Sequence, residues 1–276
     1  MNVYPLPVVY TFKRFFEGVK KYGGAPKGKI SLLLGVFSGY LPNLPVITYY
    51  FAVNPSISNV VAFTIMFLLF MTAYEIGYII NDNISSRREG KFARTVLPLI
   101  SPIKSVFYVL ERVLILSFAL LLTYEYSVID RGFLVEYSAI LSLMIALFIV
   151  YNFISTEKRA YGFLAMLRYL KHFSIMFPLI LFAPEKSTII VISLYSASLS
   201  FYGGIDYAMK KFKCVFIKTR LFHLLLYPGI MFFIFSAPLI VLNVVNYLPV
   251  LGVFAVLLGY SLLFYAGSKV FRGGAK

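Results

Sequence analysis

Long apolar stretches follow one another from residue 30 to residue 268 and are separated by short polar segments. A helix needs about 20 apolar residues to cross the roughly 30 Å of bilayer hydrocarbon. Lipid cannot satisfy free backbone groups, and the stretches lack the alternation of barrel strands, so each one is predicted to be a helix. The pattern predicts about eight transmembrane helices, or nine if one break is placed differently. The predicted spans are residues 30–53, 58–82, 105–123, 133–154, 162–183, 187–206, 220–243 and 246–268.

Composition supports an all-α integral membrane fold. The chain is 60% hydrophobic and 13% charged, and its mean hydropathy is +0.84, which excludes a soluble protein of 276 residues. We expect an interfacial N-terminal segment (residues 1–29), a single polytopic membrane domain (residues 30–268) and a cytoplasmic tail (residues 269–276). Residues 8–21 mix aromatic and basic side chains as an amphipathic helix on the membrane surface does.

Basic residues favour one orientation in the membrane. Most of the 26 lysines and arginines fall in alternate connecting segments, whereas Arg131 and Lys186 fall in the others. The positive-inside rule therefore predicts a multi-pass protein of the cell membrane with both termini in the cytoplasm. Because these residues flank membrane spans, we assign the net charge of +15 to topology and anionic headgroups, and expect no nucleic-acid partner.

A polar stripe runs along the second predicted span. Glu75, Tyr78, Asp82, Ser85 and Glu89 recur at steps of three and four, so they share one helix face. Carboxylates inside lipid are costly and indicate a functional site. Mg²⁺ prefers a few carboxylates together with substrate phosphate oxygens, so the stripe predicts a site for the diphosphate of a lipid-soluble substrate. A polar cap at the helix end is the alternative reading.

A second acidic position closes the sixth predicted span. Asp206 follows Gly203 and Gly204, and it ends the second helix of a four-helix half, as Asp82 does in the first half. Two similar halves would bring both acidic helix ends to one cavity. The two glycines allow close approach of a ligand or of a neighbouring helix.

Two sequence strings resemble the acidic motifs of the UbiA-type intramembrane prenyltransferases. Asn81-Asp82-x-x-Ser85-x-x-x-Glu89 is similar to Asn-Asp-x-x-Asp-x-x-x-Asp, and Asp206-x-x-x-Lys210 is similar to Asp-x-x-x-Asp. The segment from Arg94 to the Ile-Ser-Pro at 100–102 resembles the one after the family's first motif. The likeness covers residues 26–213. It implies helices around a central cavity and Mg²⁺-dependent transfer of an isoprenyl group from a polyprenyl diphosphate to an aromatic or other lipid-pathway acceptor.

The resemblance also implies roles for individual residues. Asp82 and Asp206 would be catalytic, and with Glu89 they would hold Mg²⁺. A further group would bind the substrate, namely Asn81, Arg88, Arg94, Tyr151, Lys158, Arg168, Lys210 and Lys211. Ser85 and Lys210 stand where the family has acids, and Lys210 and Lys211 suit phosphate as point charges.

Other readings remain open. On the fifth span Arg168, Lys171 and His172 share a face, from which they could meet the diphosphate or, for Arg168, reach the interface. The missing acids at 85 and 210 favour a catalytically inactive relative that binds lipid or a partner subunit. A phosphoribosyl diphosphate donor would use similar groups. Transport is disfavoured because the acids gather at one face of the membrane.

Overall fold

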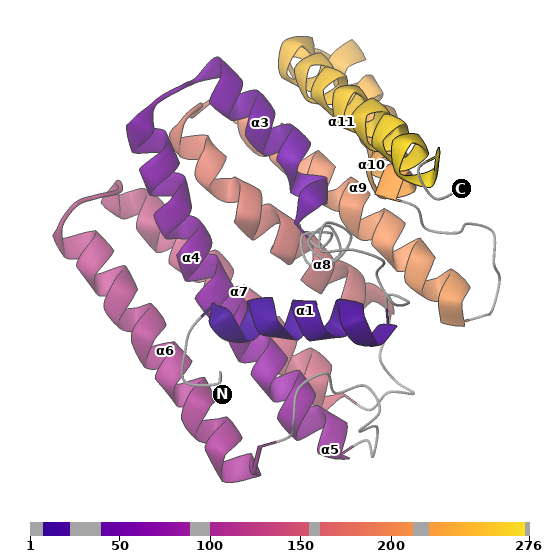
Figure 1. The fold of residues 1–276 in the computed structure, drawn as a ribbon. Coiled ribbons are helices and arrows are strands. Elements are labelled where there is room, and N and C mark those ends of the chain that lie inside the picture. The colour runs from indigo at the N-terminus through magenta and orange to yellow at the C-terminus, as the bar shows by residue number, and fades with distance from the viewer. Residues whose placement is uncertain (1–7, 23–39, 89–99, 155–160, 212–220, 274–276) are drawn as a thin grey trace. The chain divides into compact units, whose positions relative to one another are not determined.

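The structure is a computed structural model, and it describes residues 8–22, 40–88, 100–154, 161–211 and 221–273 (Figure 1). Every regular element among these residues is a helix, which confirms the predicted all-α class. The helices are α1 (Val9–Tyr22), η1 (Leu41–Asn43), α3 (Leu44–Val53), α4 (Ile57–Ile79), η2 (Ile80–Ser85), α5 (Ser86–Arg88), α6 (Pro102–Glu125), α7 (Arg131–Phe153), α8 (Tyr161–Met176), η4 (Phe177–Leu181), α9 (Lys186–Lys211), α10 (Leu221–Val241) and α11 (Tyr247–Gly273).

Four helical stretches of the described residues are long and apolar enough to cross a membrane. They are Ile57–Ser85, Pro102–Glu125, Arg131–Phe153 and Phe163–Leu181. Two shorter apolar stretches lie in α10 and α11. These helices make the chain a helical membrane protein, whereas the count of eight spans and the central cavity stay predictions.

Helix α6 has the burial pattern of a membrane helix rather than of a soluble one. Its exposed positions are large and apolar, with Ile103 83%, Leu114 70% and Phe118 62% exposed. Its buried positions include Ser105 and Arg112. An apolar outer face is stable against lipid, and polar groups then have to find partners inside the protein.

The chain folds as two compact units. Unit 1 comprises Met1–Gly39 and Val60–Leu167, and unit 2 comprises Tyr40–Asn59 and Arg168–Lys276. This grouping differs from the predicted four-helix halves, because α3, from the first predicted span, packs against α11.

Within unit 1, α6 and α7 form a hairpin beside α4, and α1 lies across α4 (Figure 1). Gly77 on α4 lets α7 approach closely, because a Cβ at this position would overlap the ring of Phe148. Side-chain caps fix both starts of the hairpin helices: Ser101 Oγ accepts from Lys104 N at 3.3 Å, and Asp130 Oδ1 accepts from Phe133 N at 2.9 Å. The packing of this unit brings α1 to the polar stripe of α4.

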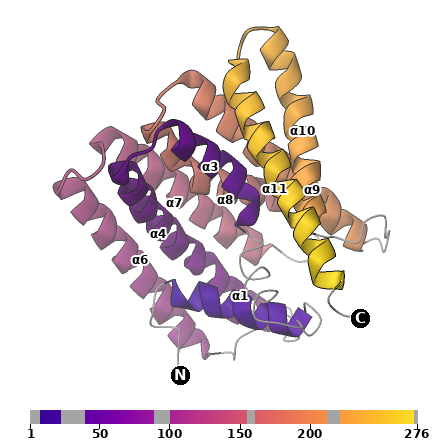
Figure 2. The same cartoon turned by 45° about the horizontal axis from the view of Figure 1, so that its top comes forward.

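Within unit 2, α10 and α11 pack on each other and both contact α9 (Figure 2). The short helix η1, which leads into α3, is tied to α9 by a hydrogen bond from Tyr195 Oη to the carbonyl oxygen of Pro42 at 2.7 Å. Pro42 and Pro45 stand in the first turns of η1 and α3, where a missing N–H costs little.

Candidate functional site

Both acids of the predicted polar stripe that the structure describes, Glu75 and Asp82, are buried inside unit 1. Glu75 is 0% exposed and Asp82 is 2% exposed. Ser85 is buried as well, and Tyr78 lies between the two acids in the stripe. Two carboxylates inside a membrane helix each need a partner, because an uncompensated buried charge is costly.

Asp82 lies where the helix changes its winding. The stretch Ile80–Ser85 is a π-helix, which widens the turn and is often found at functional sites. Polar side chains bind carbonyl oxygens around this stretch: Asn83 Nδ2 donates to Ile79 O at 3.2 Å, and Ser86 Oγ donates to Asn81 O at 2.9 Å. These side-chain bonds accompany the π-helical turn that carries Asp82.

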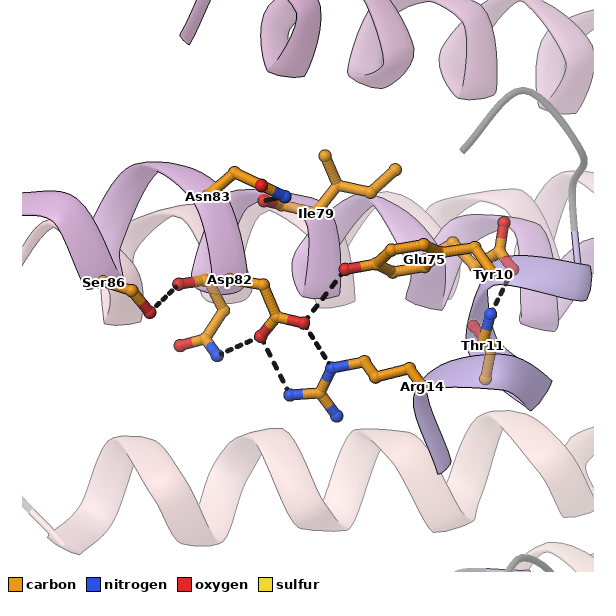
Figure 3. A network of polar contacts seen from close by, with 9 residues as sticks. Tyr10, Thr11, Arg14, Glu75, Ile79, Asp82, Asn83 and Ser86 are labelled. Atoms are coloured by element: carbon orange, nitrogen blue, oxygen red, sulfur yellow. Dashed lines mark hydrogen bonds and ion pairs between the residues drawn. The ribbon is translucent and has the colours of Figure 1, made fainter. Parts of the chain in front are cut away.

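The carboxylate of Asp82 accepts four hydrogen bonds, two of them from one arginine (Figure 3). Arg14 on α1 donates from Nε to Oδ2 at 2.6 Å and from a terminal nitrogen to Oδ1 at 2.9 Å. Tyr10 Oη donates to Oδ2 at 2.9 Å, and Asn81 Nδ2 donates to Oδ1 at 3.1 Å. A bidentate arginine is among the strongest partners a carboxylate can have.

Arg14 is held on two sides. Its guanidinium carbon lies 4.0 Å from the centroid of the Tyr78 ring, one helical turn before Asp82. Burial disfavours the charged form of Arg14, but the carboxylate of Asp82 outweighs this effect and raises the pKa of Arg14 above its usual value. A full positive charge therefore stands against Asp82.

Glu75 has a different arginine. Arg112 on α6, itself fully buried, donates from Nε to Glu75 Oε2 at 2.8 Å. The other oxygen of Glu75 accepts the backbone N–H of Thr11 at 2.9 Å. Arg112 also contacts the carboxylate of the adjacent Glu111, at 3.0 Å from a terminal nitrogen to Oε2. The side chain of Arg112 is long enough to bring its guanidinium group back to Glu111, the residue before it.

Helix α1 supplies contacts to the two acids that were not predicted from the sequence. The predicted amphipathic helix is present, but Tyr10, Thr11 and Arg14 turn toward α4 and bind both acids. Val9 and Phe12 are 42% and 38% exposed. No pattern in the sequence selects Arg14 rather than Lys13 as the partner of Asp82.

The structure describes some of the other predicted site residues of unit 1. Ser85 Oγ donates to the carbonyl oxygen of Asn152 at 3.0 Å, which brings the end of α7 and the neighbouring Tyr151 beside the first motif. Glu89, Arg94 and Lys158 lie outside the described residues. Arg88 lies on α5, but its side chain is outside the described part.

The predicted residues of the second motif belong to unit 2. Asp206, Lys210 and Lys211 lie on α9, and their side chains are outside the described part. Arg168 lies on α8 against Gly203 of α9. The prediction that Asp82 and Asp206 face one cavity therefore stays a prediction.

Among the described residues, no three His, Cys, Asp or Glu side chains gather as a metal site would require. Comparison with protein-family models, curated proteins and solved structures finds no match for the chain. The family resemblance therefore depends on the motif residues and their positions. The site combines a buried oxygen donor, a widened helical turn and a cation that neutralises the donor.

Proposed function

We propose that this chain is an integral membrane enzyme of the UbiA-type prenyltransferase class, which transfers an isoprenyl group from a polyprenyl diphosphate to a lipid-pathway acceptor. One observation carries the proposal: Asp82, the first acid of the first motif, is buried in a widened turn and is bound to the guanidinium cation of Arg14. A position built to hold a positive charge against a membrane carboxylate suits a metal-bound diphosphate.

The residues present fit Mg²⁺ on the condition that Arg14 moves away from Asp82. Asp82 and Asn81 offer oxygen donors, and Glu89 and Asp206 would add two carboxylates. Arg14 and Tyr10 now bind the oxygens of Asp82, so Arg14 has to move before a metal ion binds. When bound, Mg²⁺ neutralises the charge that develops on a diphosphate leaving group.

The chain's own residues then have separate roles. Asp82 would hold Mg²⁺, and Asn81 orients the carboxylate of Asp82 through its amide. Arg14, once released, is a cation beside the site that suits a phosphate oxygen. The remaining basic residues of the motifs would bind the diphosphate, namely Arg88, Arg94, Lys158, Lys210 and Lys211. Apolar surroundings would exclude water from the reacting carbon.

One observation favours a second candidate function. The bidentate pair between Arg14 and Asp82 satisfies both carboxylate oxygens, as a permanent structural ion pair does. With Ser85 and Lys210 in place of acids, this pair suits a catalytically inactive relative that binds lipid or a partner subunit.

Incubation of the purified full chain with radiolabelled isoprenyl diphosphates and membrane extract tests the proposal. We expect label to move from the diphosphate into an extractable product when Mg²⁺ is present, and no transfer in EDTA. The Asp82→Asn variant should lose this transfer, because an amide is a weak metal ligand. Asp130→Asn is the matched control, since asparagine caps a helix as well as aspartate does. Absence of transfer with every donor, or equal transfer by Asp82→Asn, would favour the inactive relative.

A further inference from the structure

Few of the described side chains of α1 are buried in unit 1. Those of Tyr10 and Thr11 are buried, and the other described side chains of α1 are exposed or half-buried. Tyr10 packs against Ile79 of α4 in a small apolar cluster. A segment with few buried apolar contacts opens at a low free energy. The polar contacts of α1 with Asp82 and Glu75 therefore largely decide whether α1 stays on α4.

Asp82 is bonded by two residues of α1, so moving the Arg14 side chain alone would not free it (Figure 3). Arg14 Nε donates to Oδ2 of Asp82, and Tyr10 Oη donates to the same oxygen at 2.9 Å. Tyr10 and Arg14 are four residues apart and therefore lie on one face of α1. Displacement of α1 from α4 removes both donors at once.

Thr11 makes the contact of α1 with the second acid. Its backbone N–H donates to Glu75 Oε1 at 2.9 Å. Thr11 lies in the first turn of α1, where an N–H has no acceptor within the helix. Glu75 and Asp82 are seven residues apart, which is roughly 10 Å along α4 at 1.5 Å per residue. The two acids therefore hold α1 at two separate points. Arg112 holds the other oxygen of Glu75, so this acid keeps a partner when α1 leaves.

Two unfavourable features accompany the docked position of α1, which is its position on α4 in the structure. Val8, the residue before the helix, has a φ of 68°, which is strained for a β-branched residue. Thr11 Oγ1 is buried and has no hydrogen-bond partner among the described residues, and such a group costs free energy. Release of α1 from α4 would relieve both features. The two acids therefore hold α1 in its docked position against these costs.

We propose that α1 is an autoinhibitory strap, which closes the Asp82 site while it is docked and opens the site by leaving α4 as one unit. The strap keeps the empty site free of an uncompensated carboxylate charge, because Arg14 stands in for the cation. On opening, Arg14 exchanges Asp82 for the oxygens of a diphosphate, which leaves Asp82 to the Mg²⁺ that accompanies the diphosphate. This choice of ligand rests on the proposed function, whereas the strap itself rests on the contacts of α1.

The test measures the distance between α1 and α6 by pulsed electron paramagnetic resonance on the full chain. Nitroxide labels are placed on Val9→Cys and Leu114→Cys, with Cys214→Ser removing the single native cysteine. Val9 and Leu114 are 42% and 70% exposed, and both belong to unit 1. We expect a single distance in EDTA, since α1 is then docked. A second pair of labels, on Leu114→Cys and Val135→Cys, joins α6 to α7 and should keep its distance under every condition.

Replacing Arg14 with glutamine should release α1. The ratio of released to docked chains should rise at least about tenfold, because two charge-assisted hydrogen bonds to Asp82 are lost. Lys13→Gln is the matched control and should change the ratio less than about twofold. Adding Thr11→Val to Arg14→Gln should move the ratio back about fivefold, since no buried hydroxyl is then left without a partner.

Farnesyl diphosphate should release α1 in the labelled chain that keeps Arg14 when Mg²⁺ is present, and should not do so in EDTA. Isothermal titration on the same labelled chain reports binding separately. Binding of farnesyl diphosphate without a change in the distance between the labels would overturn the strap, because the Arg14 side chain would then move alone. Absence of binding would end the proposed function, and the strap would be decided by Arg14→Gln. An unchanged distance in Arg14→Gln would overturn it.

Discussion

Replacing Arg112 with leucine is expected to lower the free energy of unfolding by about 3–5 kcal/mol, the cost of removing one partner from a buried ion pair. Both side chains of the pair are 0% exposed, so no water can take the place of the guanidinium at Glu75. The loss should appear as a lower denaturation midpoint of the detergent-solubilised chain. Arg131→Leu is the matched control, because it removes the same charge from an exposed position. The guanidinium carbon of Arg131 lies 4.8 Å from the centroid of the Tyr124 ring.

The double variant Arg112→Leu/Glu75→Leu should recover much of the loss, because no fully buried charge of the pair is left without its partner, and Glu111, the other partner of Arg112, is 27% exposed to solvent. A cost for Arg112→Leu no larger than that for Arg131→Leu would contradict the buried pair. Failure of the double variant to recover would show that Arg112 stabilises unit 1 through other contacts.

Replacing Arg14 with glutamine is expected to make the stability of the protein depend on Mg²⁺. Without metal the variant should lose roughly 3 kcal/mol, the lower end for a broken buried pair, because the Arg14 side chain is 17% exposed. Mg²⁺ at about 100 times its dissociation constant should restore about 2.7 kcal/mol by binding only the folded state. The measurement is the apparent melting temperature in EDTA and across a Mg²⁺ series.

Lys13→Gln is the control for Arg14→Gln, since Lys13 is the preceding residue and the change of charge is equal. Its melting temperature should change little and should not depend on Mg²⁺. Asp82→Asn in the Arg14→Gln background should abolish the metal dependence. If Arg14→Gln is equally destabilised with and without Mg²⁺, Asp82 is a structural anion and the inactive relative is the better reading.

The sequence predicts the all-helical class of the fold for a physical reason. In lipid every backbone group has to be satisfied within its own segment, so a long apolar stretch has essentially one available conformation. The polar face of α4 follows similarly from residue spacing, and the burial of Glu75 and Asp82 agrees with it. These properties are local along the chain and therefore visible in a single sequence.

The partners of these acids depend on tertiary packing, and the sequence does not select them. Arg14 and Lys13 are adjacent basic residues of one amphipathic helix, and the rotation of α1 on α4 decides which one meets Asp82. Arg112 is 37 residues from Glu75 in sequence. The widened turn at Ile80–Ser85 was not foreseen either; the side chains of Asn83 and Ser86 bind helix carbonyl oxygens there.

Isothermal titration of farnesyl diphosphate tests most directly whether Asp82 holds a diphosphate through Mg²⁺. Wild type, Asp82→Asn and Asp130→Asn would be titrated across a series of Mg²⁺ concentrations. The proposed function predicts that wild type and Asp130→Asn bind farnesyl diphosphate with an affinity that rises with Mg²⁺, and that Asp82→Asn loses this dependence. Absence of binding by wild type at every Mg²⁺ concentration, or an equal Mg²⁺ dependence in Asp82→Asn, would contradict it.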